Sequence, residues 1–194
     1  MNTRNMKTYF SLLMLASAFI LSCGQKDPDP EKRTKAAFSL TGFENPVPSP
    51  IKFINISTNV TSTTWDFGDG GTSTDFNPTH TYNAAGTYYL KLKVTGPTGV
   101  DSVCKVLSVE NPPAPNKTAF SYYQERCEGV PVGFSFKSLN PASTQPVWDL
   151  GNGSIALIKD AIVAYNLPGD YTVKFSTLIG GVRDTVIRVF RITQ

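Results

Sequence analysis

The sequence predicts an all-β protein made of two tandem immunoglobulin-like β-sandwiches. Residues 65–88 recur without a gap at residues 148–171, each equivalent position lying 83 residues further along the chain, which indicates two copies of one supersecondary unit. Short β-rich runs alternate with turns rich in Gly, Asn and Asp, as in sandwich domains. Each copy also contains one tryptophan, Trp65 or Trp148, of the kind that fills the space between two sheets.

Residues 1–22 are predicted to be a lipoprotein signal peptide. A basic start is followed by a mostly apolar run over residues 10–21, which is too short for a transmembrane helix. Ile20-Leu21-Ser22-Cys23 resembles a bacterial lipobox, and the resemblance implies that Cys23 is acylated and becomes the first residue of the mature protein. The alternative is an ordinary secretory signal with a chance cysteine.

Residues 23–36 are predicted to be the lipidated cysteine and a flexible tether, because they are polar, charged and contain prolines. A lysine and acidic residues after Cys23 resemble a surface-export signal of Gram-negative lipoproteins. The expected partner at this end is the membrane, reached through acyl chains that contribute about 0.8 kcal/mol per buried CH₂. The expected location is the outer membrane, with the protein lipid-anchored and exposed at the cell surface.

The charge balance argues against a nucleic-acid partner. The chain has 18 Lys and Arg residues against 15 Asp and Glu residues, a net charge of +3. Removal of Arg4 and Lys7 with the signal peptide lowers this value to +1. No dense basic run remains, so the electrostatic basis for binding nucleic acid is missing.

The rest of the chain divides into a first unit at residues 37–110, a Pro-rich linker at residues 111–117 and a second unit at residues 118–194. Prolines remove backbone donors and favour extended geometry, so the linker is predicted to be a spacer and not a strand. Units of this size are small for a self-sufficient core, and we expect the two units to support one another.

The same order of strands is predicted in both units. Each begins with a β-rich run, residues 51–56 or 132–136, and continues with the tryptophan strand and a Gly-rich turn. A strand with clear alternation follows, and a hairpin then leads to the last strand. No amphipathic helix is expected after the signal peptide. The residues of the alternating strand expected to face the core are Tyr88, Leu90, Leu92 and Val94 in the first unit, and Tyr171, Val173 and Phe175 in the second.

The repeated motif has an order that is typical of one family. Trp-Asp-Phe-Gly-Asp-Gly at residues 65–70 is followed by Asn-Pro-Thr-His-Thr-Tyr at residues 77–82 and Gly-Thr-Tyr at residues 86–88. This motif resembles a PKD domain, and the second unit resembles a degenerate one, with Asn152 and Val163 in place of the second Asp and the His. The resemblance implies a structural role for Trp65, Asp66, Gly68, Asp69, Gly70, His80, Tyr82, Gly86, Tyr88, Trp148, Asp149, Gly151, Gly153, Tyr165, Gly169 and Tyr171.

The resemblance also implies a function. PKD domains are extracellular modules that contact proteins or carbohydrates, or that act as spacers beside enzymes. The leading hypothesis is therefore a non-catalytic, surface-exposed lipoprotein whose PKD-like domains bind a glycan or a protein partner, as in adhesion. The alternative is a structural accessory subunit or spacer of a cell-envelope protein complex.

Residues for catalysis are not apparent. His80 is the only histidine, and a general base needs both a partner and an orienting group. The sequence contains no Gly-x-Ser-x-Gly elbow, no metal-spaced histidine cluster and no phosphate-binding loop. An enzyme is therefore not expected, although paired carboxylates for glycoside hydrolysis are not excluded by sequence.

The Gly-rich turn of the first unit offers weak candidates for a metal site. Asp66 and Asp69 could contribute to calcium binding, but calcium requires six to eight oxygen ligands, and few are in view. The favoured interpretation is that both carboxylates accept hydrogen bonds from turn amides while glycines adopt positive φ. Asn152 supports this interpretation, because it keeps the turn without the charge. No cofactor is therefore expected.

Cys104 and Cys127 remain once Cys23 is acylated, and export permits a disulfide. In the PKD family, a cysteine at the start of a unit often pairs with one in the last hairpin of the same unit. Here Cys104 lies on the last strand of the first unit, so a bridge to Cys127 would cross the linker and fix the two units against each other. Such a bridge requires Cα atoms within about 7 Å, and the sequence leaves open whether this distance is met.

Two further patterns suggest surface sites. Asp-Ser-Val and Asp-Thr-Val place Ser102 and Thr185 at matched positions that resemble a bacterial O-glycosylation pattern, although the start of a strand after a hairpin is the favoured interpretation. Tyr89, Tyr122 and Tyr123 are candidate ligand contacts, because exposed aromatic rings stack on sugars or pack against a partner. Packing onto a neighbouring strand is the alternative for these tyrosines.

Overall fold

The fold class predicted from the sequence is confirmed by a computed structural model, which describes residues 29–127 and 131–193. Apart from a single 3₁₀ turn, η1 (Pro30–Lys32), the regular structure in these residues consists of β-strands, and the strands pair antiparallel. No helix in the described ranges is both long and apolar enough to cross a membrane.

The first unit is a sandwich of three strands facing four. Strands β1, β2 and β5 form one sheet in that order, and β7, β6, β3 and β4 are neighbours in the other. Their bounds are β1 (Phe38–Thr41), β2 (Ser49–Asn55), β3 (Ser62–Asp66), β4 (Thr72–Ser73), β5 (Thr79–Tyr82), β6 (Gly86–Gly96) and β7 (Gly99–Val109).

The second unit repeats this arrangement. Strands β8, β9 and β12 correspond to the three-stranded sheet, and β14, β13, β10 and β11 correspond to the four-stranded one. Their bounds are β8 (Phe120–Gln124), β9 (Val132–Ser138), β10 (Thr144–Asp149), β11 (Ile155–Ala156), β12 (Asp160–Tyr165), β13 (Gly169–Ile179) and β14 (Val182–Ile192).

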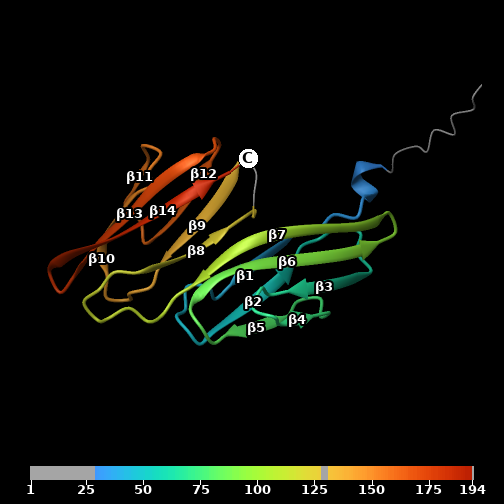
Figure 1. Ribbon diagram of the computed structural model, residues 1–194, viewed down its shortest axis with the longest axis horizontal. Helices are drawn as coiled ribbons and strands as arrows, with labels where there is room; N and C mark the ends of the chain where they lie inside the picture. The colour runs from blue at the N-terminus through green and yellow to red at the C-terminus, as the bar shows by residue number, and fades with distance from the viewer. Residues whose placement is uncertain (1–28, 128–130, 194) are drawn as a thin grey trace, which may run out of the picture.

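The two units share one sheet. The last strand of the first unit, β7, pairs with the first strand of the second, β8, through the registers Val106–Gln124 and Leu107–Tyr123. In the described part of the chain this pairing joins both units into a seven-stranded sheet with the order β12-β9-β8-β7-β6-β3-β4 (Figure 1). Residues 111–117, predicted to be a spacer, contain no strand. The chain therefore leaves β7 through the linker and returns to pair with the same strand.

Each unit has its own aromatic core around its tryptophan. Trp65 lies 5.2 Å from Phe38 and 5.5 Å from Phe53 between ring centroids, and it is buried between the sheets. Trp148 stacks on Phe175 at 4.0 Å. Large buried rings of this kind dominate the energetics of a small sandwich core, so each tryptophan serves as the centre of its unit.

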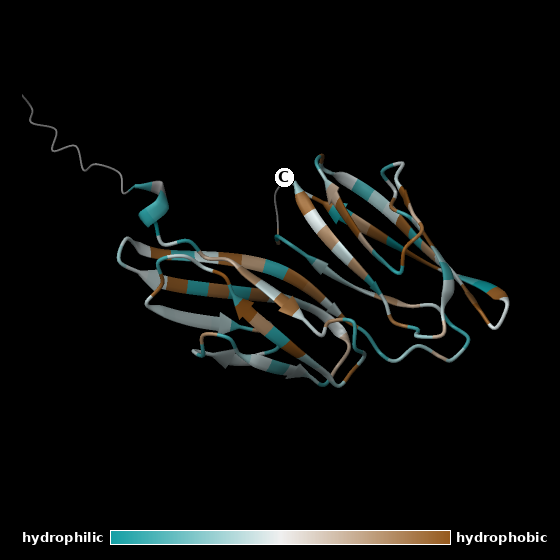
Figure 2. Cartoon of the chain, turned by 180° about the vertical axis from the view of Figure 1, so that it is seen from behind, coloured by the Kyte–Doolittle hydropathy of each residue, from teal (hydrophilic) through white to brown (hydrophobic). Residues whose placement is uncertain are grey.

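The side chains of the long strands alternate as predicted. In β6, Leu90, Leu92 and Val94 are buried, whereas the residues between them are exposed, and β13 repeats the pattern around Val173 and Phe175. Figure 2 shows this alternation as brown and teal segments along the strands. Because successive side chains point to opposite faces of a strand, the alternation fixes which face meets the core.

Candidate functional site

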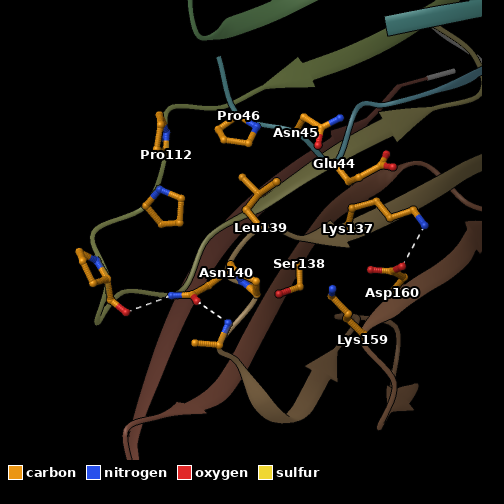
Figure 3. A pocket seen from close by; sticks show the side chains of 14 residues that line it. Glu44, Asn45, Pro46, Pro112, Lys137, Ser138, Leu139, Asn140, Lys159 and Asp160 are labelled. Atoms are coloured by element: carbon orange, nitrogen blue, oxygen red, sulfur yellow. Dashed lines mark hydrogen bonds and ion pairs between the residues drawn. The ribbon is translucent and has the colours of Figure 1, made fainter. Parts of the chain in front are cut away.

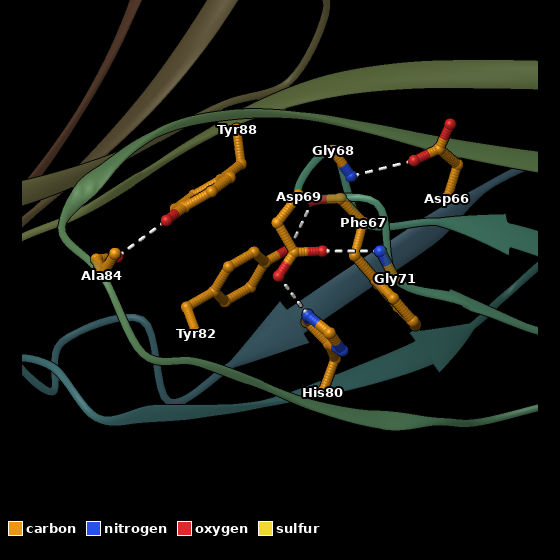
Figure 4. Close-up of polar contacts among 9 residues, drawn as sticks. All are labelled: Asp66, Phe67, Gly68, Asp69, Gly71, His80, Tyr82, Ala84 and Tyr88. Atoms are coloured by element: carbon orange, nitrogen blue, oxygen red, sulfur yellow. Dashed lines mark hydrogen bonds and ion pairs between the residues drawn. The ribbon is translucent and has the colours of Figure 1, made fainter.

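The Gly-rich turn after each tryptophan strand is held by its own acidic or amide side chains. Asp66 Oδ1 accepts a hydrogen bond from the Gly68 amide at 2.9 Å, and Asp69 Oδ1 accepts one from the Gly71 amide at 2.9 Å (Figure 4). The equivalent contacts of the second unit come from Asp149 and Asn152, to the amides of Gly151 and Ser154. An amide oxygen thus performs the same role as the Asp69 carboxylate in this turn.

His80 lies against this turn in the first unit. Its Nε2 is 2.7 Å from Asp69 Oδ2, and its ring stacks on Phe67 at 4.2 Å. Burial acts to raise the pKa of Asp69, but hydrogen bonds from His80 and from the Gly71 amide outweigh it, and the pKa is lowered. The pair of Asp69 and His80 links the turn to β5, so both side chains have a structural role.

The carboxylates of the same turn are engaged by the turn itself. Within residues 29–127 and 131–193, no group of three or more His, Cys, Asp and Glu side chains is placed to hold a metal ion. Asp66 and Asp69 direct their Oδ1 atoms to turn amides, as the favoured interpretation of the sequence predicted.

The glycines of the turn are required by a close backbone approach. Gly68 has φ +80°, and a Cβ atom at this position would lie 2.8 Å from the Tyr89 amide nitrogen. Gly151 has φ +74°, and its Cβ would lie 2.7 Å from the carbonyl oxygen of Thr172, which is the residue equivalent to Tyr89. A side chain at either glycine would strain the turn and push it off the neighbouring strand.

Two tyrosines in each unit tie loops to the sandwich. Tyr82 donates to the Phe67 carbonyl at 2.8 Å, and its equivalent Tyr165 donates to the Leu150 carbonyl at 2.7 Å. Burial raises the pKa of both phenols, so they remain protonated donors. Tyr88 donates to the Ala84 carbonyl at 2.7 Å, which is the tyrosine-corner contact (Figure 4). Tyr171 repeats it in the second unit, with the Leu167 carbonyl at 2.9 Å.

A disulfide and a buried lysine hold the junction between the units. Cys104 on β7 is bonded to Cys127, with the Cα atoms 5.6 Å apart, so the bridge crosses the linker as the sequence allowed. Next to it, the buried Lys105 donates from Nζ to the Phe38 carbonyl and to Glu125 Oε2, each at 2.6 Å. A buried charge needs such partners, and Lys105 takes them from both units.

A second ion pair joins the units at the far end of β7. Arg188 Nη1 on β14 is 2.7 Å from Glu110 Oε1, and the guanidinium lies 4.7 Å from the centroid of the Phe120 ring. The Ser108 hydroxyl also donates to Glu110. The shared sheet, the disulfide and the two ion pairs therefore fix the relative orientation of the units.

The fixed junction creates a groove, which is the candidate binding site. It encloses about 810 Å³ between the loop after β1, the linker and one end of the second unit (Figure 3). Prolines form much of its wall, and charged and amide side chains lie at its edge. The residues that line this junction groove are Glu44, Asn45, Pro46, Pro112, Pro113, Pro115, Lys137, Ser138, Leu139, Asn140, Pro141, Ala142, Lys159 and Asp160.

The polar groups of the junction groove are held in place. Lys137 Nζ is 2.9 Å from Asp160 Oδ2, and Asn140 donates from Nδ2 to the Pro115 carbonyl (Figure 3). Asn140 Nδ2 also donates to the Lys117 carbonyl. Asn140 is buried and also accepts the Ala142 amide at 2.9 Å, so it couples the linker to the loop after β9. The groove therefore has ordered walls before a ligand binds, which is usual for a binding site.

A smaller hollow of about 290 Å³ shares Lys137 and Asp160 with the junction groove. Phe43 and Tyr123 lie along one side of it, and Ile162, which is 81% exposed, lies on the other. The Tyr123 hydroxyl is buried and has no hydrogen-bond partner in the described residues. The hollow extends the junction groove across the outer face of the β8-β9-β12 sheet.

The three candidate tyrosines lie in different environments. Tyr89 is 62% exposed on β6, in agreement with the exposure that its role requires. The expected exposure of Tyr123 is wrong, because this residue is 5% exposed and packs in the core of the first unit against Phe43. Tyr122 is half-buried on the core of the second unit and lies 4.9 Å from Phe190. Tyr122 and Tyr123 are less exposed than expected because β8 belongs to the shared sheet and is covered on both faces.

The aspartates of the two matched Asp-Ser/Thr-Val segments have a structural role. Asp101 Oδ2 accepts the Ala36 amide at 2.8 Å, and Asp184 Oδ2 accepts the Thr118 amide at 2.6 Å, so each aspartate anchors the start of its unit. The hydrogen bond from Thr118 is the main cause of a lowered pKa for Asp184. Ser102 and Thr185 are exposed, and their glycosylation stays a prediction.

Cys23 and the predicted signal peptide lie outside the described residues, so lipidation stays a prediction. Two functional features were not predicted from the sequence: Lys105 at the centre of the junction, and the pair Lys137 and Asp160 in the groove. A lysine at an inward position of β7, between apolar neighbours, is the signal that could have identified Lys105. The groove pair has no comparable signal, because it depends on how the units meet.

Comparison with known proteins assigns a family to the first unit. Residues 45–110 match the family model for the PKD domain, and this segment is a PKD domain. A segment of 69 residues is 42% identical to collagenase ColA of Bacillus cereus, and a segment of 41 residues is 49% identical to a microbial collagenase of Vibrio alginolyticus. These matches cover 34% and 21% of this chain but only 7% and 5% of the two collagenases.

Solved structures with similarity to the chain include further PKD domains. The PKD1 domain of the Vibrio cholerae metalloprotease PrtV is 33% identical, with a TM-score of 0.35, and the match covers 40% of this chain and 98% of that one. The PKD1 domain of Vibrio anguillarum Epp is 29% identical, with a TM-score of 0.35, over 41% and 95%. A structure from a study of carbohydrate-binding modules of the β-sandwich superfamily is 14% identical, with a TM-score of 0.40, over 84% and 86%.

Proposed function

We propose that this chain is a non-catalytic binding module that holds an extended polypeptide segment in the junction groove. The observation that carries the proposal is the construction of the groove from both units, whose orientation is fixed by the shared sheet and by the disulfide between Cys104 and Cys127. A preorganised groove loses little conformational freedom on binding, which favours affinity.

The composition of the groove favours polypeptide over carbohydrate. Sugar rings are commonly held by exposed aromatic side chains, and the residues that line the junction groove include no aromatic ring. Prolines, Leu139 and the amide of Asn140 suit the mixed apolar and polar surface of an extended peptide. The names of the two collagenase relatives point in the same direction, since they act on a fibrous protein.

The proposal includes the location of the module. An acyl chain on Cys23 would anchor the protein to the outer membrane, and the residues that follow it would hold both units away from the bilayer. The tether is shorter than the predicted residues 23–36, because Thr34, Lys35 and Ala36 form hydrogen bonds with the first unit. Presentation at the cell surface would give the groove access to extracellular protein. The lipobox resemblance of residues 20–23 supports this part of the proposal.

The alternative function is a structural accessory subunit of an envelope complex. It is favoured by the second unit, which carries eight of the twelve exposed large apolar side chains in the described residues. Surfaces of this kind are typical of protein contacts. A protein that performs this role would co-purify with a fixed partner.

The test compares binding of the purified chain to immobilised gelatin, to triple-helical collagen and to a glycan array. Ala142→Arg places a long side chain in the junction groove at an exposed position and is expected to weaken binding to protein about tenfold. Ala84→Arg, at an exposed alanine of the first unit, is the matched control and is expected to bind as the wild type. Equal binding by both variants, or binding to glycans alone, would contradict the proposal.

A further inference from the structure

A second hollow lies between the two units and, among the described residues, shares none of its lining with the junction groove. It encloses about 550 Å³, which is within the usual range for sites that bind small ligands. The first unit contributes residues 85–87 and 108–110 to its walls, and the second contributes Tyr122 and residues 188–190. We call this space the inter-unit hollow.

A charged pair in the inter-unit hollow is held in place by the protein. Arg188 Nη1 is 2.7 Å from Glu110 Oε1, and the buried hydroxyl of Ser108 donates to the same carboxylate oxygen. The guanidinium also lies 4.7 Å from the centroid of the Phe120 ring. The two charges therefore neutralise each other, and both groups are oriented before a ligand binds.

The polar groups that line the hollow have hydrogen-bonding capacity to spare. Within the described residues, the Arg188 guanidinium makes one hydrogen bond, although it has five N–H donors, and Glu110 Oε2 accepts none. The hydroxyls of Thr87 and Tyr122 make no hydrogen bond to the same part of the chain. A ligand that displaces water from these groups must therefore offer both donors and acceptors.

An exposed aromatic ring lies next to the inter-unit hollow. Thr87 and Tyr89 are two residues apart on β6, so they project from the same face of the strand, about 7 Å apart along it. Tyr89 is 62% exposed, and Val189 on the opposite wall is equally exposed. Such side chains offer apolar surfaces on which the C–H face of a sugar ring can pack.

The chemistry of the hollow selects one class of ligand. An anion or a cation gains little electrostatic attraction, because Arg188 and Glu110 already neutralise each other. An apolar ligand would remove water from the polar groups without replacing its hydrogen bonds. A neutral sugar meets both conditions, since each hydroxyl donates and accepts and the ring has apolar faces.

We propose that the inter-unit hollow binds a neutral oligosaccharide, with one sugar ring in the hollow and the next stacked on Tyr89. Hydroxyls of the first ring accept hydrogen bonds from Arg188 and donate to Glu110, and its apolar face packs on Val189. The site requires both units in their fixed orientation, because Tyr89 and Glu110 belong to the first unit, whereas Arg188 and Tyr122 belong to the second.

The test titrates the purified full chain with neutral tetrasaccharides of glucose, galactose, mannose, xylose and N-acetylglucosamine, and with a tetramer of galacturonic acid. Isothermal titration calorimetry is expected to show saturable binding of at least one neutral tetramer and none of the acidic one. Tyr89→Ala removes the exposed ring and is expected to weaken binding about tenfold. Phe76→Ala, which removes a ring that is 50% exposed and lies outside the hollow, is the matched control and is expected to bind as the wild type.

A second variant tests the polar part of the site without disturbing the packing. Tyr122→Phe keeps the ring that lies 4.9 Å from Phe190 and removes only the hydroxyl. Because this hydroxyl has no partner in the described residues, the thermal unfolding midpoint is expected to stay unchanged. Binding of the tetrasaccharide is expected to weaken about threefold to tenfold, as for one lost hydrogen bond.

The outcomes separate this inference from the groove proposal, on which it does not rest. Ala142→Arg in the junction groove is expected to bind the tetrasaccharide normally, and Tyr89→Ala is expected to bind gelatin normally. Absence of binding to every neutral tetramer at about 10 mM overturns the inference. Preference for the galacturonic acid tetramer, or equal loss in Tyr89→Ala and Phe76→Ala, also overturns it.

Discussion

The two units make the same internal contacts but have different surfaces. The turn hydrogen bonds of Asp66 and Asp69, and the tyrosine contacts of Tyr82 and Tyr88, have equivalents in the second unit at the same spacing. The exposed positions have diverged along the side edge of the sandwich. Residues Thr72, Thr74, Asp75 and Thr79 of the first unit are replaced by Ile155, Leu157, Ile158 and Ile162, which are exposed.

This difference shows which parts of the repeat are constrained by folding. Buried polar groups must keep their partners, so the motif that supplies those partners persists in both units. Exposed positions carry no such requirement, and an apolar residue there contributes little to folding. Exposed apolar side chains in such number, as in the second unit, are typical of a surface that contacts another molecule.

The largest expected effect tests whether both cores matter equally. Trp65→Ala and Trp148→Ala each remove a fully buried ring and are expected to lower the free energy of unfolding by about 4 kcal/mol. Urea unfolding followed by far-UV circular dichroism measures the loss. Because β7 and β8 share a sheet, each variant is expected to destabilise both units. A variant that leaves the other unit with its original midpoint would show that the units fold independently.

A smaller effect is expected from the bond between the units. Cys104→Ser with Cys127→Ser removes a disulfide that closes a sequence separation of 23 residues, and the expected loss of stability is about 3 kcal/mol. Thermal unfolding measures this loss. Alkylation of the denatured wild-type protein without reductant is expected to label neither Cys104 nor Cys127. Labelling of both would show that the bridge is absent.

The smallest effect concerns the second carboxylate of the turn, Asp69, which only the first unit has. Asp69→Asn keeps an acceptor for the Gly71 amide but loses the charged contact with His80, so the expected loss is about 1 kcal/mol at neutral pH. The pKa of Asp69 is lowered in the folded state, so its contribution is present above the unfolded value of about 3.9. The contribution is lost as the pH falls through the folded pKa.

The difference in stability between wild type and Asp69→Asn is therefore expected to shrink as the pH falls below about 4. Unfolding measured across this range checks the sign. Asn152→Asp is the matched control, because Val163 occupies the position of His80 and offers no partner. A gain of stability in Asn152→Asp would contradict the role assigned to the histidine.

The motif-bearing parts of the fold were predictable from the sequence, because their signals are local. The alternation around Leu90 and Leu92 fixes a strand face, and the spacing of Tyr88 from the preceding loop indicates its corner contact. The junction between the two units was harder to predict from the sequence. β8 carries large side chains on both faces, including Tyr122 and Tyr123, a pattern of strands buried on both sides. Whether such a strand pairs within its unit or across units depends on the path of the linker.

The candidate groove could not be predicted for a related reason. Its walls come from segments that are distant in sequence, such as the loop with Pro46 and the loop with Asn140. Their proximity follows from the pairing of β7 with β8, which has no signature of its own. By contrast, the roles of Asp66 and Asp69 were accessible, because a carboxylate two residues before a glycine amide is a local turn contact.

The disulfide at the junction also has a mechanical consequence. A protein tethered at its N-terminus and attached to a partner through its second unit carries tension across the junction between the units. The bond from Cys104 to Cys127 transmits that tension directly, so the linker and β8 do not bear it. The 23-residue separation between the two cysteines therefore cannot extend under force. At roughly 3.5 Å per extended residue, about 80 Å of contour length stays locked while the bond is intact. Under load the disulfide therefore keeps the two units joined as one rigid body.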